Sequence, residues 1–101
     1  MKDLINKLNK AFENRIRLGI MSVLVVSEKV DFNHLKETLD ATDGNLASHI
    51  SALEKKGYIT VTKIFIGKKP NTSFEVTKEG KKAFTDHLDA LEALLKMKNS
   101  M

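Results

Sequence analysis

Apolar residues recur at intervals of three and four along most of the chain, which is the pattern of amphipathic α-helices. The first such run predicts a helix over residues 1–12. Its apolar positions are Leu4, Ile5, Leu8 and Phe12. A second helix is predicted over about residues 13–27 and is apolar on nearly all sides, so neighbouring elements or a second copy of the chain must cover it.

Two further helices are predicted in the middle of the chain, joined by a tight turn. The first begins after Asp31, whose side chain is a suitable N-cap, and ends near Asp40. The second begins at Gly44 and ends before Gly57, because glycine readily adopts the left-handed conformation that terminates helices. Its inner side is formed by Leu46, Ile50 and Leu53, and its outer side by Asn45, Ser48, His49, Ala52 and Lys56.

The helical pattern stops after Gly57 and resumes only near the end of the chain. Residues 58–66 and 72–76 are rich in β-branched and aromatic side chains and predict two strands, with a turn of a β-hairpin over residues 67–71. Because two strands alone are marginally stable in water, this hairpin must pack on the helices. A last helix is predicted over residues 78–97, with Thr77 as its cap. Its two apolar stripes are Phe84, Leu88, Leu91 and Leu95, and Ala83, Ala90, Leu94 and Met97.

This order of elements predicts a mainly α fold with a small β-hairpin, in the α+β class. The segments TDGNLASHI at residues 42–50 and LEKKGYI at residues 53–59 resemble the recognition helix and following strand of small MarR/ArsR-like winged-helix regulators. GKKPNT at residues 67–72 and VTKEG at residues 76–80 resemble their wing and the start of their final helix, and NRIRLGIM at residues 14–21 resembles their first core helix.

The resemblance implies a winged helix-turn-helix with a three-helix core, a wing and terminal dimerisation helices. The whole chain, residues 1–101, would form one such DNA-binding domain. Its parts would be the terminal helices (residues 1–12 and 78–97), the helix-turn-helix (32–56) and the wing (58–76). The resemblance also leaves open a small-molecule effector, since MarR-type regulators often bind small ligands.

The distribution of charge supports a polyanionic partner. Residues 55–82 carry eight lysines and two glutamates, a net charge of +6, whereas residues 1–54 and 83–101 each carry −1. Such segregation is typical of a nucleic-acid-binding face, although a solvated lysine-rich surface would look the same.

The outer face of the predicted helix after residue 43 is suited to a DNA major groove, which admits one α-helix. Asn45, Ser48 and His49 carry polar groups that could reach base edges. The helix N-terminus at Thr42 and Gly44 could donate backbone N–H groups to a phosphate, although the charge of Asp43 opposes this.

The lysines of the hairpin and its surroundings would contact the DNA backbone. Lys68 and Lys69, with Asn71, lie at the predicted hairpin tip, where cations can follow phosphates or enter a narrow minor groove. Lys55, Lys56 and Lys63 would contact phosphates without reading sequence. The alternative is that all these residues are merely solvated.

The terminal helices carry more apolar surface than one small core can enclose, which predicts a homodimer on a pseudo-palindromic DNA site. The expected interface residues are Leu4, Ile5, Leu8, Phe12, Leu88, Leu91, Leu94 and Leu95. The alternative is that the two terminal helices cover each other within one chain.

Other functions have weaker support in the sequence. The absence of cysteine excludes disulfides, thiolate zinc sites and cysteine nucleophiles. Ser48 and His49 would splay about 100° apart on a helix, and Asp86 and His87 have no second histidine to complete a metal site, so we expect no enzyme, no metal and no cofactor. The alternative function is a winged-helix protein-interaction module without DNA binding. With no signal peptide or membrane span, a cytoplasmic location is expected.

Overall fold

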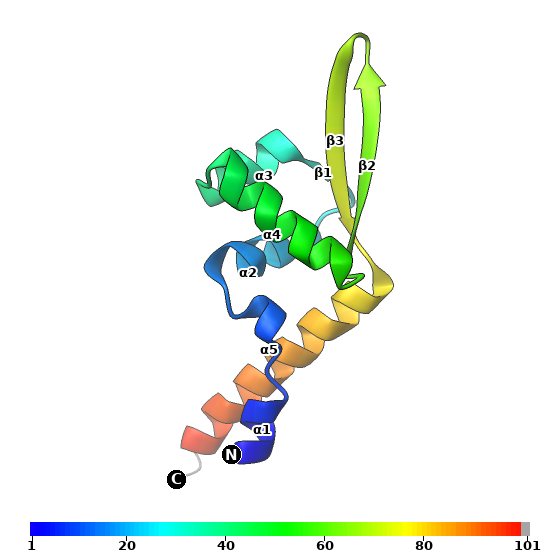
Figure 1. Ribbon diagram of the computed structural model, residues 1–101. Helices are drawn as coiled ribbons and strands as arrows, with labels where there is room; N and C mark the ends of the chain where they lie inside the picture. Colours follow the sequence, from blue (N-terminus) through cyan, green and yellow to red (C-terminus); the bar gives the residue numbers. More distant parts are fainter. Residues whose placement is uncertain (100–101) are drawn as a thin grey trace.

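The computed structural model describes residues 1–99 and shows a winged helix (Figure 1). Its elements, in chain order, are α1 (Lys2–Asn6), the 3-10 helix η1 (Lys10–Phe12), α2 (Arg15–Leu24), β1 (Val30–Asp31), α3 (Phe32–Leu39), α4 (Asp43–Lys55), β2 (Ile59–Ile66), β3 (Lys69–Val76) and α5 (Lys78–Asn99). Helices α2, α3 and α4 form the centre, and the β2–β3 hairpin is the wing (Figure 1). Helix α5 runs from the base of the hairpin to the opposite end of the molecule, where α1 lies. The predicted α+β winged helix is therefore confirmed.

The hydrophobic core lies where α2, α3 and α4 meet the base of the sheet. Its fully buried side chains are Ile20, Met21, Leu24, Leu35, Leu46, Leu53, Ile59 and Phe74. Burying each of these stabilises the fold by about 1.5–3 kcal/mol relative to exposure. The inner face predicted for α4 is thus confirmed, since Leu46, Ile50 and Leu53 are all buried.

Side-chain caps and left-handed residues set the limits of the helix-turn-helix as predicted. The Asp31 carboxylate accepts a hydrogen bond from the backbone N–H of His34 at 2.8 Å, and α3 ends at Asp40, which has φ +49°. The Thr42 hydroxyl accepts from the backbone N–H of Asn45 at 3.2 Å. Gly57, with φ +79°, follows the end of α4 as predicted, whereas α4 begins at Asp43, one residue before the predicted start at Gly44.

The sheet has three antiparallel strands in the order β1-β3-β2, one more than the hairpin predicted. Val30 pairs with Phe74, but a two-residue strand has no alternation for a sequence pattern to detect. The hairpin is also longer than expected, because β3 starts at Lys69 and pairs Phe65 with Pro70. Its turn is therefore only two residues, with Gly67 at φ +66°.

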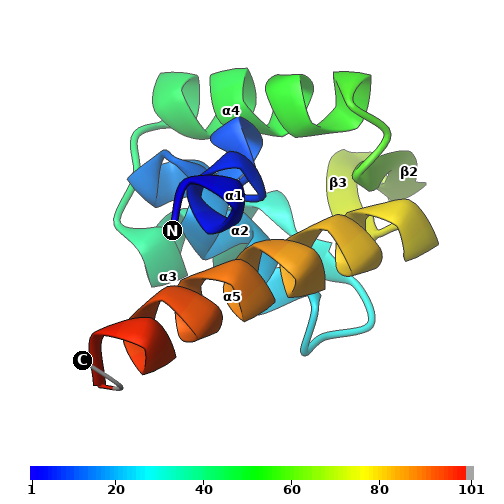
Figure 2. The ribbon, with the colours of Figure 1, turned by 90° about the horizontal axis from the view of Figure 1, so that it is seen from below.

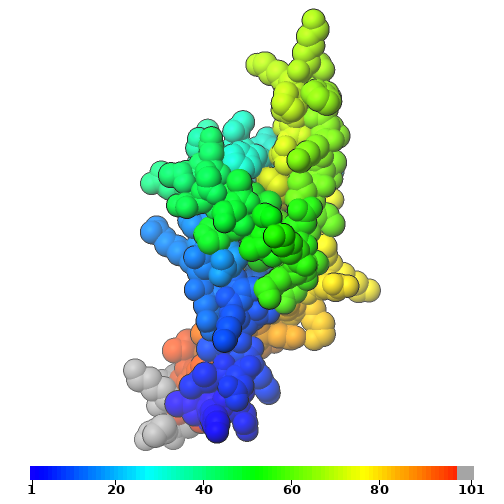
Figure 3. Space-filling view, in the orientation of Figure 1, coloured from blue at the N-terminus to red at the C-terminus, as the bar shows by residue number. Residues whose placement is uncertain are grey.

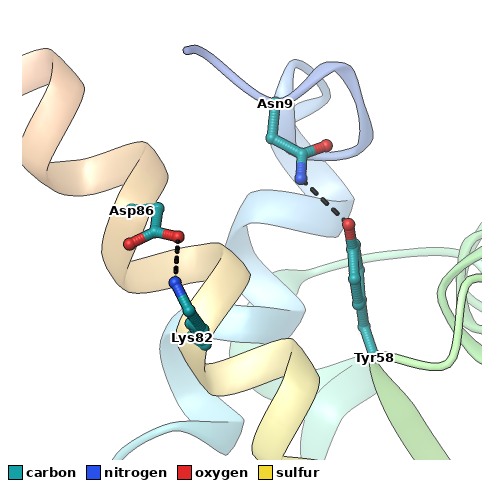
Figure 4. Close-up of polar contacts among 4 residues, drawn as sticks. All are labelled: Asn9, Tyr58, Lys82 and Asp86. Atoms are coloured by element: carbon teal, nitrogen blue, oxygen red, sulfur yellow. Dashed lines mark hydrogen bonds and ion pairs between the residues drawn. The ribbon is translucent and has the colours of Figure 1, made fainter.

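The first twelve residues do not form the continuous helix that was predicted. Helix α1 ends at Asn6, and Asn9 begins η1 by accepting the backbone N–H of Ala11 at 2.9 Å. The Asn9 amide also donates to the Tyr58 hydroxyl at 3.0 Å (Figure 4). The Asn9 backbone N–H donates to Nδ1 of His87 at 2.9 Å. Asn9 therefore interrupts the helix by tying the chain to the residue before β2 and to α5.

This interruption corrects one expected dimer residue. Phe12 is 2% exposed and packs edge-on against Phe84, with ring centroids 5.2 Å apart. Phe12 therefore belongs to the core of a single chain, because η1 places its ring against Phe84 of α5.

Helix α5 crosses beneath the helical core and contacts α1 (Figure 2). Gly80, Phe84, His87 and Ala90 of α5 are buried. Phe84 comes from the first predicted stripe and Ala90 from the second, whereas Gly80 and His87 belong to neither. Ala90, which was expected among the surplus apolar residues, is thus covered within the chain. Leu88, Leu91 and Leu95 remain exposed on α5. The alternative, in which the two terminal helices cover each other within one chain, therefore holds only in part.

Candidate nucleic-acid interface

Helix α4 presents an exposed face of small and polar residues on the side away from the core. Asn45, Ser48, Ser51 and Lys55 are all exposed. Residues three or four apart share a helix face, so Ser48, Ser51 and Lys55 form one row along it. Thr42 and Gly44 are exposed at the start of the helix. This face can approach a flat or grooved partner closely, because none of its first residues is bulky.

An ion pair from α3 neutralises the acid at the start of this face. Lys36 Nζ lies 2.7 Å from a carboxylate oxygen of Asp43. The charge that would repel a phosphate at the α4 N-terminus is therefore balanced. Lys36 was not among the expected site residues, since no spacing rule links positions on two separate helices.

His49 lies differently from the other predicted residues of the α4 face. It is half-buried, and its Nδ1 accepts a hydrogen bond from Nη1 of Arg17 at 2.9 Å. Arg17 also donates from Nε to the backbone carbonyl of Ala11 at 2.6 Å. Burial, and then the charge of Arg17, lower the pKa of His49, which favours the neutral imidazole. His49 thus joins α4 to α2, and Arg17 is engaged inside the chain.

A cleft of about 580 Å³ separates α4 from the hairpin. Residues lining it from α4 include Ala47 and Ser51, and residues from the strands include Lys63 and Thr72. The hairpin rises beside α4 and extends well beyond it (Figure 3). Ser51 and Thr72 were not among the expected site residues. Ser51 could have been found from its spacing to Ser48, whereas Thr72 is identified by its pairing with Lys63.

The hairpin is basic along its exposed length. Lys63, Lys68 and Lys69 are exposed, and the one acidic residue between positions 59 and 76 is Glu75, which pairs with Thr60 near the base of the hairpin. Asn71 is half-buried opposite Ile64. Lys55 and Lys56 are exposed at the end of α4. Lys63 therefore lines the α4 cleft, which also holds Glu54 of α4, and Lys68 and Lys69 occupy the hairpin tip. Lys56 lines a separate hollow together with Lys10 and Arg17.

Two further features, a metal site and a membrane-spanning helix, are absent from residues 1–99. No three histidine or acidic side chains gather there in a way that could hold a metal ion. No helix in the same range has the length and apolar content needed to cross a bilayer.

The comparison with known families agrees with this geometry. Residues 16–95 match the model of a family described as the winged helix DNA-binding domain. The chain belongs to this winged helix family. The match covers the helix-turn-helix, the wing and most of α5.

Relatives of this winged helix protein include archaeal and bacterial proteins. It is 35% identical over 79 residues to the uncharacterized protein MJ0432 of Methanocaldococcus jannaschii. The matched stretch covers 78% of this chain and 86% of that protein. The structure of a transcriptional regulator homologue from Pyrococcus horikoshii is similar with a TM-score of 0.85 and 34% identity, covering 95% of this chain and 96% of that one.

The fold is also that of MarR-like regulators, as the sequence indicated. A Bacillus cereus protein assigned to the MarR-like transcription regulators matches with a TM-score of 0.70 and 24% identity, over 96% of this chain and 72% of that one. The family and fold are thus those of DNA-binding transcriptional regulators.

Proposed function

We propose that this winged helix protein binds specific sequences of double-stranded DNA and represses transcription by occupying a promoter. The observation that carries the proposal is the arrangement of α4 and the hairpin around one cleft, with polar residues on the helix and lysines on the hairpin. A B-DNA major groove about 12 Å wide admits α4, and the neighbouring minor groove is then within reach of the hairpin.

Each part of this surface has a distinct task in the proposal. Asn45 and Ser48 read base edges in the major groove, where asparagine can bond adenine with two hydrogen bonds. Thr42 and Gly44 bring the α4 N-terminus to a phosphate, with Asp43 neutralised by Lys36. The DNA backbone that separates the major groove from the minor groove lies along the cleft between α4 and the hairpin. Its phosphates are contacted by Lys55, Lys56, Lys63, Ser51 and Thr72, while Lys68, Lys69 and Asn71 approach the minor groove.

Two copies of the chain would bind DNA together, joined through α1 and α5. Helix α1 has five residues and buries none of them, and so short a helix is not stable by itself in water. Ile5 on α1 and Leu88, Leu91 and Leu95 on α5 are exposed apolar side chains at this end of the molecule. A second copy would cover them, with Leu4, Leu8 and Leu94, which are already half-buried, at the border.

A twofold dimer recognises a site with matching symmetry. Its two α4 helices would enter successive major grooves on one side of the duplex, about 34 Å apart. The preferred DNA sequence would therefore be a pseudo-palindrome with half-sites one helical turn apart.

A gel-shift assay tests the proposed DNA binding. The wild-type protein is expected to shift a random duplex, and the double substitution Lys68→Glu and Lys69→Glu is expected to abolish the shift. Lys78→Glu with Lys81→Glu on α5 is the matched control, since it changes the net charge equally at exposed positions away from the hairpin tip and leaves the ion pair of Lys82 with Asp86 intact. Binding that is equally weakened by both variants, or no shift by the wild type, would contradict the proposal.

A further inference from the structure

The hairpin tip carries large apolar side chains in water, among its lysines. Phe65 is 73% exposed, Ile66 63% and Ile64 49%. The stabilisation from an apolar side chain grows with the area that it removes from water, so these exposed residues contribute little to the folded chain as it stands. Exposed apolar groups of this kind, rimmed by polar residues, mark interaction sites.

The strand register shows which of these side chains faces the α4 side. Side chains alternate between the faces of a strand, and residues directly opposite each other in an antiparallel pair share a face. Phe65 and its partner Pro70 therefore lie on the same face as Val61 and Phe74. Phe74 is buried in the core and Val61 lines the α4 cleft, whereas Phe65 and Pro70 continue this face toward the tip, where Pro70 borders a hollow at the start of α3. Ile64 and Ile66 lie on the opposite face.

Lys63 lies between the cleft and Phe65 on the same face, paired with Thr72. Lys68 is in the turn, and Lys69 follows it at the start of β3. Lys69 pairs with Ile66 and so lies on the opposite face. The apolar pair is thus bordered by positive charge from Lys63 on the cleft side and from Lys68 at the turn, which favours a polyanion as the occupant. Because the same face leads into the α4 cleft, the polyanion that reaches Phe65 would also cross that cleft.

We infer that Phe65 and Pro70 form an apolar wedge that the wing inserts into the minor groove of DNA, unstacking a base step and bending the duplex. This inference rests on the proposed DNA binding and deepens it. An ordinary minor groove is about 6 Å wide, too narrow for a ribbon of two strands about 4.8 Å apart with their side chains. Apolar side chains inserted between base pairs kink the duplex toward the major groove and open the minor groove, so the tip can enter.

Insertion of this wedge makes the preferred DNA sequence depend on how easily the duplex deforms, as well as on the hydrogen bonds made to its bases. Pyrimidine–purine steps such as TA and CA are the easiest to kink. The preferred site should therefore hold such a step where the wing tip lies, outside the bases that α4 contacts.

Binding and bending assays on one selected DNA site test the wedge. Sequences bound by the wild-type protein are first selected from a random pool, and a duplex of that sequence is labelled at its ends with a donor and an acceptor dye. Phe65→Ala is expected to weaken binding at least about tenfold, equivalent to about 1.4 kcal/mol, and to reduce energy transfer between the dyes. The slope of log affinity against log salt should stay unchanged, because no charge is lost. Phe65→Leu should retain part of both effects.

Val26→Ala is the matched control, since it shortens an exposed apolar side chain outside the hairpin and outside the surfaces assigned to DNA. It should leave affinity within about twofold and bending unchanged. If Phe65→Ala binds and bends DNA like the wild type while Lys68→Glu with Lys69→Glu loses binding, the wedge is wrong and the DNA-binding function stands. If the wild type binds no duplex, both fail. If Phe65 is needed only for binding to phosphatidylserine vesicles, the tip is a membrane contact and the wedge is overturned.

Discussion

Nη1 of Arg17 lies 2.9 Å from Nδ1 of His49, which joins the first core helix to the helix that we assign to the major groove. Because arginine can only donate, the imidazole nitrogen must accept, and a histidine protonated at both nitrogens cannot form this bond. Arg17 is itself fixed by its bond to the Ala11 carbonyl. The orientation of α4 on the core thus depends partly on the protonation state of His49.

This pair makes stability depend on pH in one direction. Burial and Arg17 lower the pKa of His49 in the folded protein below its ordinary value of 6.5, so the unfolded chain binds the proton more readily. The stabilisation is full above about pH 6.5 and is lost as the pH falls through the lower pKa of the folded state. We expect the free energy of unfolding, from urea titrations between pH 7.5 and 5, to fall more for the wild type than for His49→Gln. Parallel curves would show that the pair does not act in this way.

Two glycines in helices predict opposite responses to alanine. A Cβ added at Gly80 would overlap the backbone carbonyl of Tyr58, which cannot move because it accepts the backbone N–H of Thr77. Gly80→Ala should therefore destabilise the fold by about 2 kcal/mol or more. At Gly44 a Cβ meets nothing within 4 Å, so Gly44→Ala should raise stability by up to about 1 kcal/mol. Denaturant unfolding measures both, and equal effects would contradict the packing described for α5.

The apolar end of the molecule predicts a dimer that polar substitutions dissociate. Leu91→Glu with Leu95→Glu places two charges on the exposed face of α5, where a second copy would bury them without partners. Sedimentation equilibrium should find a dimer for the wild type at micromolar concentration and a monomer for the variant, with equal helix content by circular dichroism. Val26→Glu, at another exposed apolar position outside the terminal helices, should remain a dimer. A monomeric wild type would rule out the proposed dimer.

The parts of the fold that could be predicted from sequence are those governed by local rules. Asp31, Thr42 and Gly57 limit helices through their own side chains or backbone conformation, so the helix-turn-helix could be predicted closely. A glycine inside a helix costs about 1 kcal/mol relative to alanine, so Gly80 indicates close packing, and a Cβ there would indeed meet the Tyr58 backbone. By contrast, the helix predicted over residues 1–12 fails because Asn9 bonds Tyr58 and His87, which are far away in the sequence.

The same distinction holds for the candidate site. Asn45, Ser48 and Lys55 follow from the periodicity of one helix, and the lysines of the hairpin from its composition. The engagement of His49 by Arg17, the neutralisation of Asp43 by Lys36 and the cleft between Ser51 and Thr72 each depend on two elements packing together. Phe65 had no visible role in the sequence, because the pattern of a strand does not show that the strand extends beyond its helices.

Chemical footprinting tests most directly whether α4 and the wing bind adjacent grooves of one duplex. Dimethyl sulfate methylates guanine N7 in the major groove and adenine N3 in the minor groove, so one reaction on a selected site reports both. We expect protected guanines and protected adenines on the same side of the duplex, separated by about half a helical turn of ~5 base pairs. Lys68→Glu with Lys69→Glu should remove the adenine protection first. Protection of one groove alone, or of neither at concentrations that shift the duplex, would contradict the account.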